Sequence, residues 1–393
     1  MLARKLLVHR TIVCQDRGLT FRGRRQRRDP SDANREPDST AYRRYRHARP
    51  DGRLRWLADG RTAGRRRLEG LEGEERTAKL AELAEAEGTL NIYTSNTDLA
   101  EFSDAFADTY EVEVSVYRAQ STQVLQRILQ ESEANFAGSD MVDTNAEELS
   151  TMNTEGLLRD YEGPVEEGLD ESAQQEGWTG SRLNVYVTAW NTEEFPDAER
   201  PTEYTDLADP KFRGRLMLEA RAFEWYMALS DYFTAEGMSQ EEVDGLMEGI
   251  VANATLITGN TIQAQFLASG EFGATANVYN HLVDEEEANG APARWKPEPV
   301  EPVVVRPNGQ ALMRTAQNPA AALLFFEWML TEGQPLLVDQ FRVPARTSDQ
   351  DGLLDGIEQA VVDVDKLVSE GADWESRYEE LLQGALGQRE AED

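Results

Sequence analysis

The chain of 393 residues contains one cysteine, Cys14, and three histidines, His9, His47 and His281. A single cysteine excludes an internal disulfide and any metal site built on paired cysteines. Two of the histidines lie near the N-terminus, so a histidine-based zinc site or a Ser–His–Asp triad elsewhere would have to use His281. No apolar run reaches ~18 residues, the length that a transmembrane helix needs.

Lysine is also scarce after residue 76, where only four occur: Lys79, Lys211, Lys296 and Lys366. Residues 1–76 hold 21 Lys and Arg against 11 Asp and Glu, whereas residues 77–393 hold 19 against 62. The balance is therefore +10 in the first part and −43 in the second. So many acids on a periodic, globular pattern indicate adaptation to molar salt, where the screening length is about 3 Å. Nucleic acid is excluded as a natural partner of the acidic part.

The basic N-terminal segment lacks a recognisable function. It shows no helix-turn-helix pattern, and its short apolar stretch is interrupted by His9 and Arg10, so no secretory signal is recognisable. Cys14 does not complete a lipoprotein signal, because Val13 stands where a small residue is needed. A nucleic-acid arm and a targeting segment remain open. We interpret residues 1–86 as a disordered tail or the product of a wrongly chosen start.

The acidic part opens with repeated strand, polar loop and helix. An apolar strand at 90–93 is followed by a polar loop and by Asp98, which we expect to cap a helix together with Glu101. The alternating valines at 112–116 predict a second strand, with Ser121 and Thr122 as the next cap. Residues 139–143 predict a third. This order is typical of a parallel α/β sheet, in which ligands bind at the carboxyl ends of the strands.

A second α/β set begins near residue 213, with strands expected at 215–219, 255–258 and 273–277. The Pro-rich segment 297–302 then leads into a strand and a helix that Pro319 begins. We therefore expect two lobes, each a mostly parallel sheet flanked by helices: 88–184 plus 302–345, and 185–301 plus 346–393, whose last part is a helical cover. A chain that crosses between lobes more than once forms a hinge, and a hinge forms a closing cleft.

Three stretches carry a family signature: EGTLNIYTS to NTEGLL (87–158), LADPKFRGRLMLEA (207–220) and QNPAAALLFFEWMLTEGQPLL (317–337). Together they resemble type II extracellular solute-binding proteins of ABC importers. The resemblance is greatest to the ferric-iron-binding group and its relatives that take phosphonates, sugar phosphates or thiamine. It implies a two-lobed periplasmic-binding-protein-like fold and a monomer that delivers its solute to a membrane permease. It also implies an extracellular or periplasmic location, as a membrane-anchored lipoprotein, and requires no cofactor.

Residues and resemblance together predict a ligand site at the strand ends. In lobe one the candidates are Thr94, Ser95, Asn96, Ser121, Thr122, Asp143, Thr144 and Asn145; in lobe two they are Ala220, Arg221, Ala222, Asn260, Asn277 and Tyr279. The resemblance places Tyr279 on a tyrosine that holds Fe(III) in the iron binders, and the second group on positions that hold a small oxyanion.

The iron pattern is incomplete. Asn280 replaces a second tyrosine, the first loop has no histidine, and Asn145 stands where a glutamate would be expected. We interpret His281 as a surface residue. Arg221, at a strand-to-helix junction, is suited to an oxyanion. The expected cargo is thus Fe(III) with an anion, or a phosphonate-like or sugar-phosphate-like solute.

Two other functions stay open. The first is an enzyme on the same two-lobed fold. The thiol nucleophile of a thiamine-degrading enzyme has no candidate in the acidic part, although a carboxylate pair would serve other chemistry. The second is a ligand-sensing regulator that binds DNA through the basic N-terminus, which would need a helix-turn-helix before residue 87.

Overall fold

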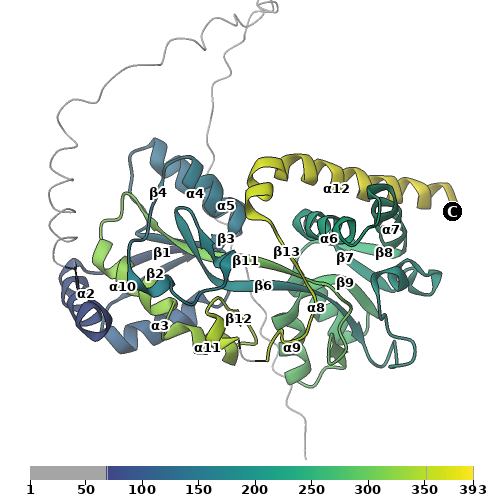
Figure 1. Cartoon of the computed structure of the whole chain (residues 1–393), viewed down its shortest axis with the longest axis horizontal. Helices are drawn as coiled ribbons and strands as arrows, with labels where there is room; N and C mark the ends of the chain where they lie inside the picture. The colour runs from purple at the N-terminus through teal and green to yellow at the C-terminus, as the bar shows by residue number, and fades with distance from the viewer. Residues whose placement is uncertain (1–67, 69, 351, 393) are drawn as a thin grey trace, which may run out of the picture. The chain divides into compact units, whose positions relative to one another are not determined.

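One mixed sheet runs through the folded part of the chain (Figure 1). The computed structural model describes residues 68, 70–350 and 352–392, with side chains up to residue 384. The strand order is β2-β1-β3-β11-β6-β9-β7-β8. We call lobe one the part around β1, β2 and β3, and lobe two the part around β7, β8 and β9. The predicted α/β class and two-lobed fold are confirmed.

In lobe one the strands are parallel and each leads into a helix. The elements follow the predicted order: β1 (Leu90–Thr94), α3 (Leu99–Tyr110), β2 (Val114–Arg118), α4 (Ser121–Glu133), β3 (Met141–Asn145) and α5 (Ala146–Thr154). Apolar side chains at helical spacing, such as Leu99, Phe102 and Phe106, are buried against the sheet.

Lobe two repeats the arrangement. Its elements are β7 (Leu216–Glu219), α6 (Phe223–Ala235), α7 (Gln240–Asn253), β8 (Ala254–Ile257), α8 (Asn260–Ser269), β9 (Ala274–Tyr279) and α9 (Asn280–Ala288). The parallel pairs β7–β8 and β7–β9 bring the carboxyl ends of the three strands to one edge of the sheet.

Two long antiparallel strands join the lobes. They are β6 (Trp178–Asn191) and β11 (Val303–Met313), every residue of which is buried. On one flank β11 pairs with β3, and on the other β6 pairs with β9. The lobe boundaries given above stay a prediction.

The remaining elements cover or extend the two lobes. They are the helices α2 (Gly73–Glu87), α10 (Pro319–Met329), α11 (Gly333–Asp339) and α12 (Val364–Glu392), and the short strands β4 (Leu158–Arg159), β5 (Gln174–Gln175), β10 (Ala293–Arg294), β12 (Val343–Pro344) and β13 (Gln359–Val361). Short 3-10 turns occur at Pro164–Glu166, Glu171–Ala173, Tyr204–Ala208, Pro210–Phe212 and Thr347–Asp349. No helix within the described residues is long and apolar enough to cross a membrane.

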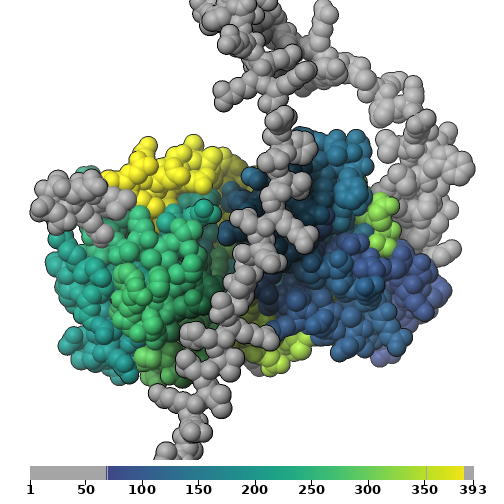
Figure 2. Space-filling model, turned by 180° about the vertical axis from the view of Figure 1, so that it is seen from behind, coloured from purple at the N-terminus to yellow at the C-terminus, as the bar shows by residue number. Residues whose placement is uncertain are grey.

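Helix α12 packs on α6 and α7 of lobe two and also on α5 of lobe one. Figures 1 and 2 show it in yellow along one side of lobe two, with its first turns beside α5 in Figure 1. Its own side chains Trp374, Tyr378 and Leu382 are buried. The predicted helical cover therefore touches both lobes.

Two local predictions were wrong. Asp98 precedes α3 but makes no capping hydrogen bond, because its carboxylate is used by two arginines. Helix α4 is capped by Gln120 and Gln123 in a capping box, with Ser121 as its first residue. In both cases the local sequence indicated an N-cap residue, but a different side chain makes the capping hydrogen bond or uses the predicted one.

The predicted N-terminal tail extended too far along the chain. Residues 1–67, which hold Cys14, His9 and His47, lie outside the described residues. Helix α2, however, occupies the end of the predicted tail and packs on α10. Its Arg76 side chain is paired with Glu327, with 2.6 Å between Nη2 and Oε1 and 8% of each side chain exposed.

We expect Arg76→Ala to lower the free energy of unfolding by about 3–5 kcal/mol, because it leaves the Glu327 charge buried without its partner. Urea unfolding of the full chain in molar KCl measures this. The matched control is Lys79→Ala, which removes a surface pair with Glu82 on the same helix and should cost under about 1 kcal/mol. Equal, small effects of both changes would show that α2 is not anchored through Arg76.

Candidate functional site

The sheet register brings the polar ends of the lobe-one strands together. Thr94 at the end of β1 pairs with Asp143 on β3, and Asn145 at the end of β3 pairs with Asn308 on β11. Two of the predicted polar loops therefore meet at one edge of the sheet, beside the strand that leads to lobe two.

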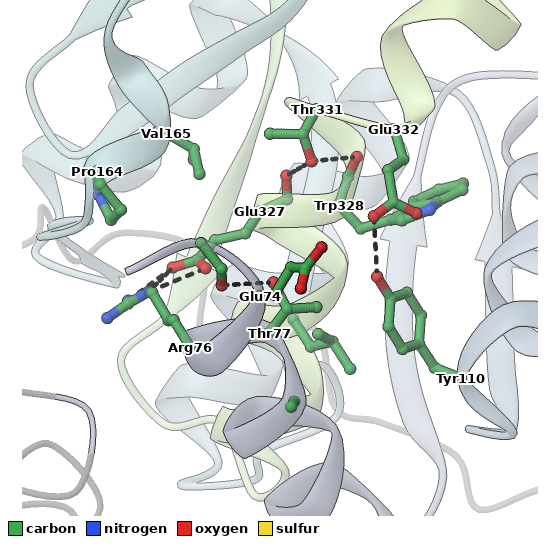
Figure 3. A pocket seen from close by; sticks show the side chains of 13 residues that line it. Glu74, Arg76, Thr77, Tyr110, Pro164, Val165, Glu327, Trp328, Thr331 and Glu332 are labelled. Carbon is green, nitrogen blue, oxygen red and sulfur yellow. Dashed lines mark hydrogen bonds and ion pairs between the residues drawn. The ribbon is translucent and has the colours of Figure 1, made fainter. Parts of the chain in front are cut away.

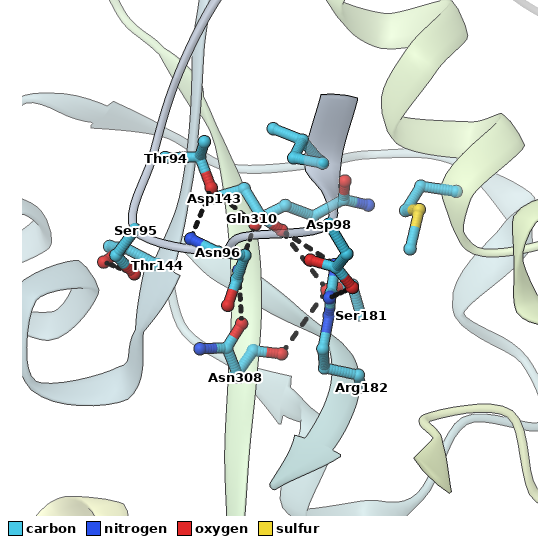
Figure 4. Close-up of polar contacts among 12 residues, drawn as sticks. Thr94, Ser95, Asn96, Asp98, Asp143, Thr144, Ser181, Arg182, Asn308 and Gln310 are labelled. Atoms are coloured by element: carbon cyan, nitrogen blue, oxygen red, sulfur yellow. Dashed lines mark hydrogen bonds and ion pairs between the residues drawn. The ribbon is translucent and has the colours of Figure 1, made fainter. Parts of the chain in front are cut away.

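Most of these side chains are hydrogen-bonded to one another (Figure 4). The Thr94 hydroxyl donates to Asp143 Oδ1 at 3.1 Å, and the Asn96 amide donates to Asp143 and to Asn308 Oδ1. Ser95 and Thr144 share a hydrogen bond of 2.8 Å. Thr94 and Asp143 are buried, so this group holds the loops together. Its role in ligand contact stays a prediction.

Buried arginines lie behind these loops. Arg182 Nη1 and Arg342 Nε each lie 2.6 Å from Asp98 Oδ2. Burial opposes the charged form of Asp98, but the two guanidiniums hold the pKa of that carboxyl below its ordinary value. Burial raises the pKa of Asp143, against the effect of Arg182. These charges connect α3, β3 and β6 and so fix the lobe-one side of the junction.

His281 lies next to this cluster, so its prediction as a surface residue was wrong. Its side chain is buried, and its ring stacks on Tyr279 with 5.7 Å between the centroids. Burial, together with Arg342 and Arg182, moves the pKa of His281 well below its ordinary value. The ring is therefore neutral at physiological pH.

A second polar network joins the lobes around Arg306 on β11. Arg306 Nη1 donates to Glu224 Oε1 of lobe two at 2.7 Å, and Nη2 donates to the Tyr279 hydroxyl and to Asn145 Oδ1 of lobe one. Tyr186 on β6 completes it, with its hydroxyl 3.0 Å from both Glu224 Oε1 and the Tyr279 hydroxyl. One guanidinium thus links β3, β9 and α6.

Several carboxylates converge on this network. Glu147 and Glu148 lie in the first turn of α5 of lobe one, Glu224 lies in the first turn of α6 of lobe two, and Glu375 lies on α12. Desolvation, followed by repulsion from Glu148, Glu224 and Glu375, raises the pKa of Glu147 to about 7. Burial also raises the pKa of Glu148, against a hydrogen bond from Ser121 and the charge of Arg306. Acids from both lobes and from α12 therefore act on one another.

Two buried atoms of this group have no partner within the described residues: Glu148 Oε2, an acceptor, and Arg306 Nε, a donor. Buried polar atoms are normally paired, so unpaired ones at one junction indicate a place for water or ligand. Ser121 is half-buried beside Glu148, and Thr122, which follows it, is exposed.

The predicted lobe-two loops lie at the ends of β7 and β8, but their amides are not free. The Glu219 carboxylate accepts hydrogen bonds from the backbone N–H of Arg221 at 3.3 Å and of Gly259 at 2.7 Å. The Asn277 side chain accepts from the Glu219 N–H. Asn260 Oδ1 has no partner among the described residues, and the Arg221 side chain is exposed. Ala220 and Ala222 flank Arg221 without polar side chains.

Sequence reasoning missed the charged centre of this junction. The residues concerned are Glu147, Glu148, Tyr186, Glu219, Glu224, Arg306 and Glu375. The sequence did contain a signal for Arg306, which directly follows the apolar run Val303–Val305, because a charge inside a buried strand needs a partner. The glutamates carried no such signal, because acids in the first turn of a helix are common.

A separate pocket of about 470 Å³ lies on lobe one between α2 and α10 (Figure 3). Its lining includes Glu74, Thr77, Tyr110, Trp328 and Glu332. None of the strand-end loops contributes to it, and Tyr110 and Glu332 are hydrogen-bonded to each other across it. It is therefore distinct from the junction site.

Residues 141–296 match the family model for bacterial extracellular solute-binding proteins. The match includes β3, the whole of the joining strand β6, and the strand-end loops of lobe two. Over this region the chain is similar to that family, and its two-lobed α/β fold is the one found in solved solute-binding proteins. The family is one of transport proteins and not of enzymes.

Known relatives resemble this solute-binding protein along most of their length. Iron uptake protein A1 of Synechocystis sp. is 24% identical over 278 residues, covering 66% of this chain and 76% of that protein. Iron-bound HitA of Pseudomonas aeruginosa is 20% identical with a TM-score of 0.61, covering 74% of this chain and 99% of that one. AfuA of Actinobacillus pleuropneumoniae, with fructose-6-phosphate bound, is 20% identical with a TM-score of 0.63, covering 75% and 99%.

The raised pKa of Glu147 predicts a pH dependence of stability. From pH 4.5 to about 7 the folded chain holds more protons at this group than the unfolded chain does, so Glu147 lowers the free energy of unfolding as the pH rises. Glu147→Gln removes this contribution. The stability of the variant relative to the native chain should therefore increase across that window, measured by urea unfolding at several pH values.

Glu242→Gln is the control with the opposite sign. Hydrogen bonds from the Ser239 backbone and hydroxyl hold the pKa of Glu242 below its ordinary value. Its stabilisation is present above pH 4.5 and is lost as the pH falls through the lowered pKa, so the relative stability of this variant should decrease as the pH rises. The same pH trend in both variants would contradict the assignment for Glu147.

Proposed function

We propose that this solute-binding protein captures a positively charged solute between its lobes, with Fe(III) as the candidate cargo, and delivers it to an ABC permease. The observation that carries this proposal is the group of carboxylate and phenol oxygens, from Glu224, Tyr186 and Tyr279, that lies around Arg306 where the lobes meet. Three separate elements, α6, β6 and β9, thus bring oxygen atoms to one place.

Repulsion between Glu148 and Glu224 favours a cation. Burial, with the nearby Glu224 charge, raises the pKa of Glu148, which reflects the cost of keeping this buried carboxylate charged. A bound cation offsets that cost, so binding should release protons and draw the two lobes together.

Oxygen atoms dominate the junction, which fits a hard cation. Carboxylate and phenol oxygens of Glu148, Glu224, Tyr186 and Tyr279 surround it, and hard ions such as Fe(III) prefer such ligands. Within the described residues no three Asp, Glu, His or Cys side chains are yet placed around one metal position. Capture would therefore require Glu148 and Glu224 to approach each other.

Arg306 occupies the centre of these oxygens, between Glu224 and Tyr279. Its guanidinium supplies the positive charge that the acids need while no cargo is bound. Burial and the nearby Glu224 charge raise the pKa of Tyr279, although Arg306 acts against this. We propose that a metal cargo displaces Arg306 from the Tyr279 hydroxyl and takes its place, with loss of the phenol proton.

The relatives support a metal cargo and also supply the second candidate. Iron uptake protein A1 and iron-bound HitA carry iron in their names, whereas AfuA was crystallised with fructose-6-phosphate. A phosphorylated solute is favoured here by one observation, the exposed side chain of Arg221 beside the N-terminus of α6. The amides that a phosphate would use nearby are already taken by Glu219.

Solute-binding proteins of this family act with ABC permeases outside the cytoplasmic membrane, and we propose the same setting for this chain. A monomeric state, a lipoprotein anchor and adaptation to molar salt stay predictions. The ligand roles of the strand-end residues Ser95, Ser121, Asn145 and Asn260 are likewise part of the proposal.

The cargo can be tested with the full chain in molar KCl, titrated with Fe(III) supplied as its nitrilotriacetate complex. We expect a rise in melting temperature and a visible absorption band from a tyrosine phenolate bound to Fe(III). Tyr279→Phe should weaken binding by more than about tenfold and reduce the band. Tyr232→Phe, whose hydroxyl contacts Glu358 at the surface of lobe two, is the matched control and should change neither.

Fructose-6-phosphate and inorganic phosphate form the comparison arm of this titration. A melting shift with either one, and none with Fe(III), would reject the cation proposal in favour of the second candidate. Absence of any response to all three would contradict both. Full binding by Tyr279→Phe would remove Tyr279 from the site while leaving the cation proposal intact.

A further inference from the structure

The Glu219 carboxylate is held at the carboxyl ends of two neighbouring strands. It lies at the end of β7, and residue Glu219 is 4% exposed. Its two oxygens accept from two different loops: Oε1 from the Arg221 N–H after β7, and Oε2 from the Gly259 N–H after β8. The side chain therefore bridges the turns that precede α6 and α8.

Backbone N–H groups at such strand-to-helix turns are the usual place for an oxyanion in a parallel α/β sheet. Gly259 has φ of +110°, a conformation that L side chains rarely adopt, and it precedes α8 directly. The Arg221 side chain adds positive charge nearby. The turns thus have the geometry of an anion site, and a side chain of the protein occupies it.

The main chain of Glu219 is fixed as firmly as its side chain. Its N–H donates to Asn277 Oδ1 at 2.8 Å, and its carbonyl accepts from the Tyr378 hydroxyl of α12 at 2.6 Å. These contacts with β9 and α12 fix the position on β7 from which the carboxylate reaches the two amides. A free anion would compete against a partner that is already in place.

We infer that Glu219 is a built-in anion, which closes the amide site of lobe two to free oxyanions and lets the cargo bind without a companion anion. The first part of this inference stands on the geometry of Glu219 alone. The second part rests on the proposed function, because it concerns the cation held beside Glu224 and Tyr279. Glu219 would then set specificity by excluding phosphate-bearing solutes from this end of the cleft.

The test removes the carboxylate and asks whether phosphate takes its place. The full chain and its Glu219→Ala variant are heated in molar KCl with increasing inorganic phosphate. We expect no phosphate-dependent shift for the native chain, and a rise of about 3 °C or more for the variant at saturating phosphate. Glu236→Ala, which removes an exposed acid from the same lobe, is the matched control and should not respond.

Two outcomes would overturn the inference. An equal phosphate response of the native chain would show that the amides are free. No response of folded Glu219→Ala would show that they do not form an anion site. If Glu219→Ala fails to fold, phosphate should restore its folding. The control is Leu218→Ala, a core variant of the same strand, whose folding phosphate should not restore. Failure of phosphate to restore the folding of Glu219→Ala would also overturn the inference.

The companion-anion part has its own readout. Fe(III) binding by the native chain should have the same affinity with and without phosphate or carbonate, and an increase of tenfold or more with either anion would overturn it. If Fe(III) does not bind at all, the proposed cargo is rejected, and so is the inference that the cargo binds without a companion anion. The phosphate response of Glu219→Ala would still decide whether Glu219 is the built-in anion.

Discussion

The pairing of β6 with β11 is the constraint on which the rest of the structure depends. These antiparallel strands are hydrogen-bonded along the segment between the lobes, and each also pairs with a strand of one lobe. Their register decides which groups meet at the junction. At the lobe-one end it places Asn308 opposite Asn145. At the lobe-two end Tyr186 lies between Val304 on one side and Tyr279 on the other.

Sequence periodicity predicted the elements better than the contacts. The strands of both lobes were found because each has a local apolar pattern, and Pro319 marked the start of α10. The charged centre was not found, because it depends on distant pairs such as Glu224 with Arg306. Asp98 illustrates the limit: its local pattern indicated a cap, whereas Arg182 and Arg342, far along the chain, use its carboxylate.

The junction is organised by charges that the protein supplies to itself. Arg306 lies among oxygens, and Glu219 lies among amides, so each part already has a counterpart of the opposite sign. Such buried charges add little to stability compared with apolar packing, but they discriminate strongly between partners.

Continuity of the sheet between the lobes also determines what kind of motion they can make. No loose linker separates them at β6 and β11, since both strands stay buried and paired throughout. Rotation of one lobe against the other must therefore change the twist of the two-stranded ribbon that β6 and β11 form. Paired strands are naturally twisted, and two-stranded ribbons tolerate a wide range of twist. Helix α12, packed on both lobes, resists that torsion from outside the sheet. The two joining strands and α12 together therefore set the resistance of the molecule to torsion between its lobes.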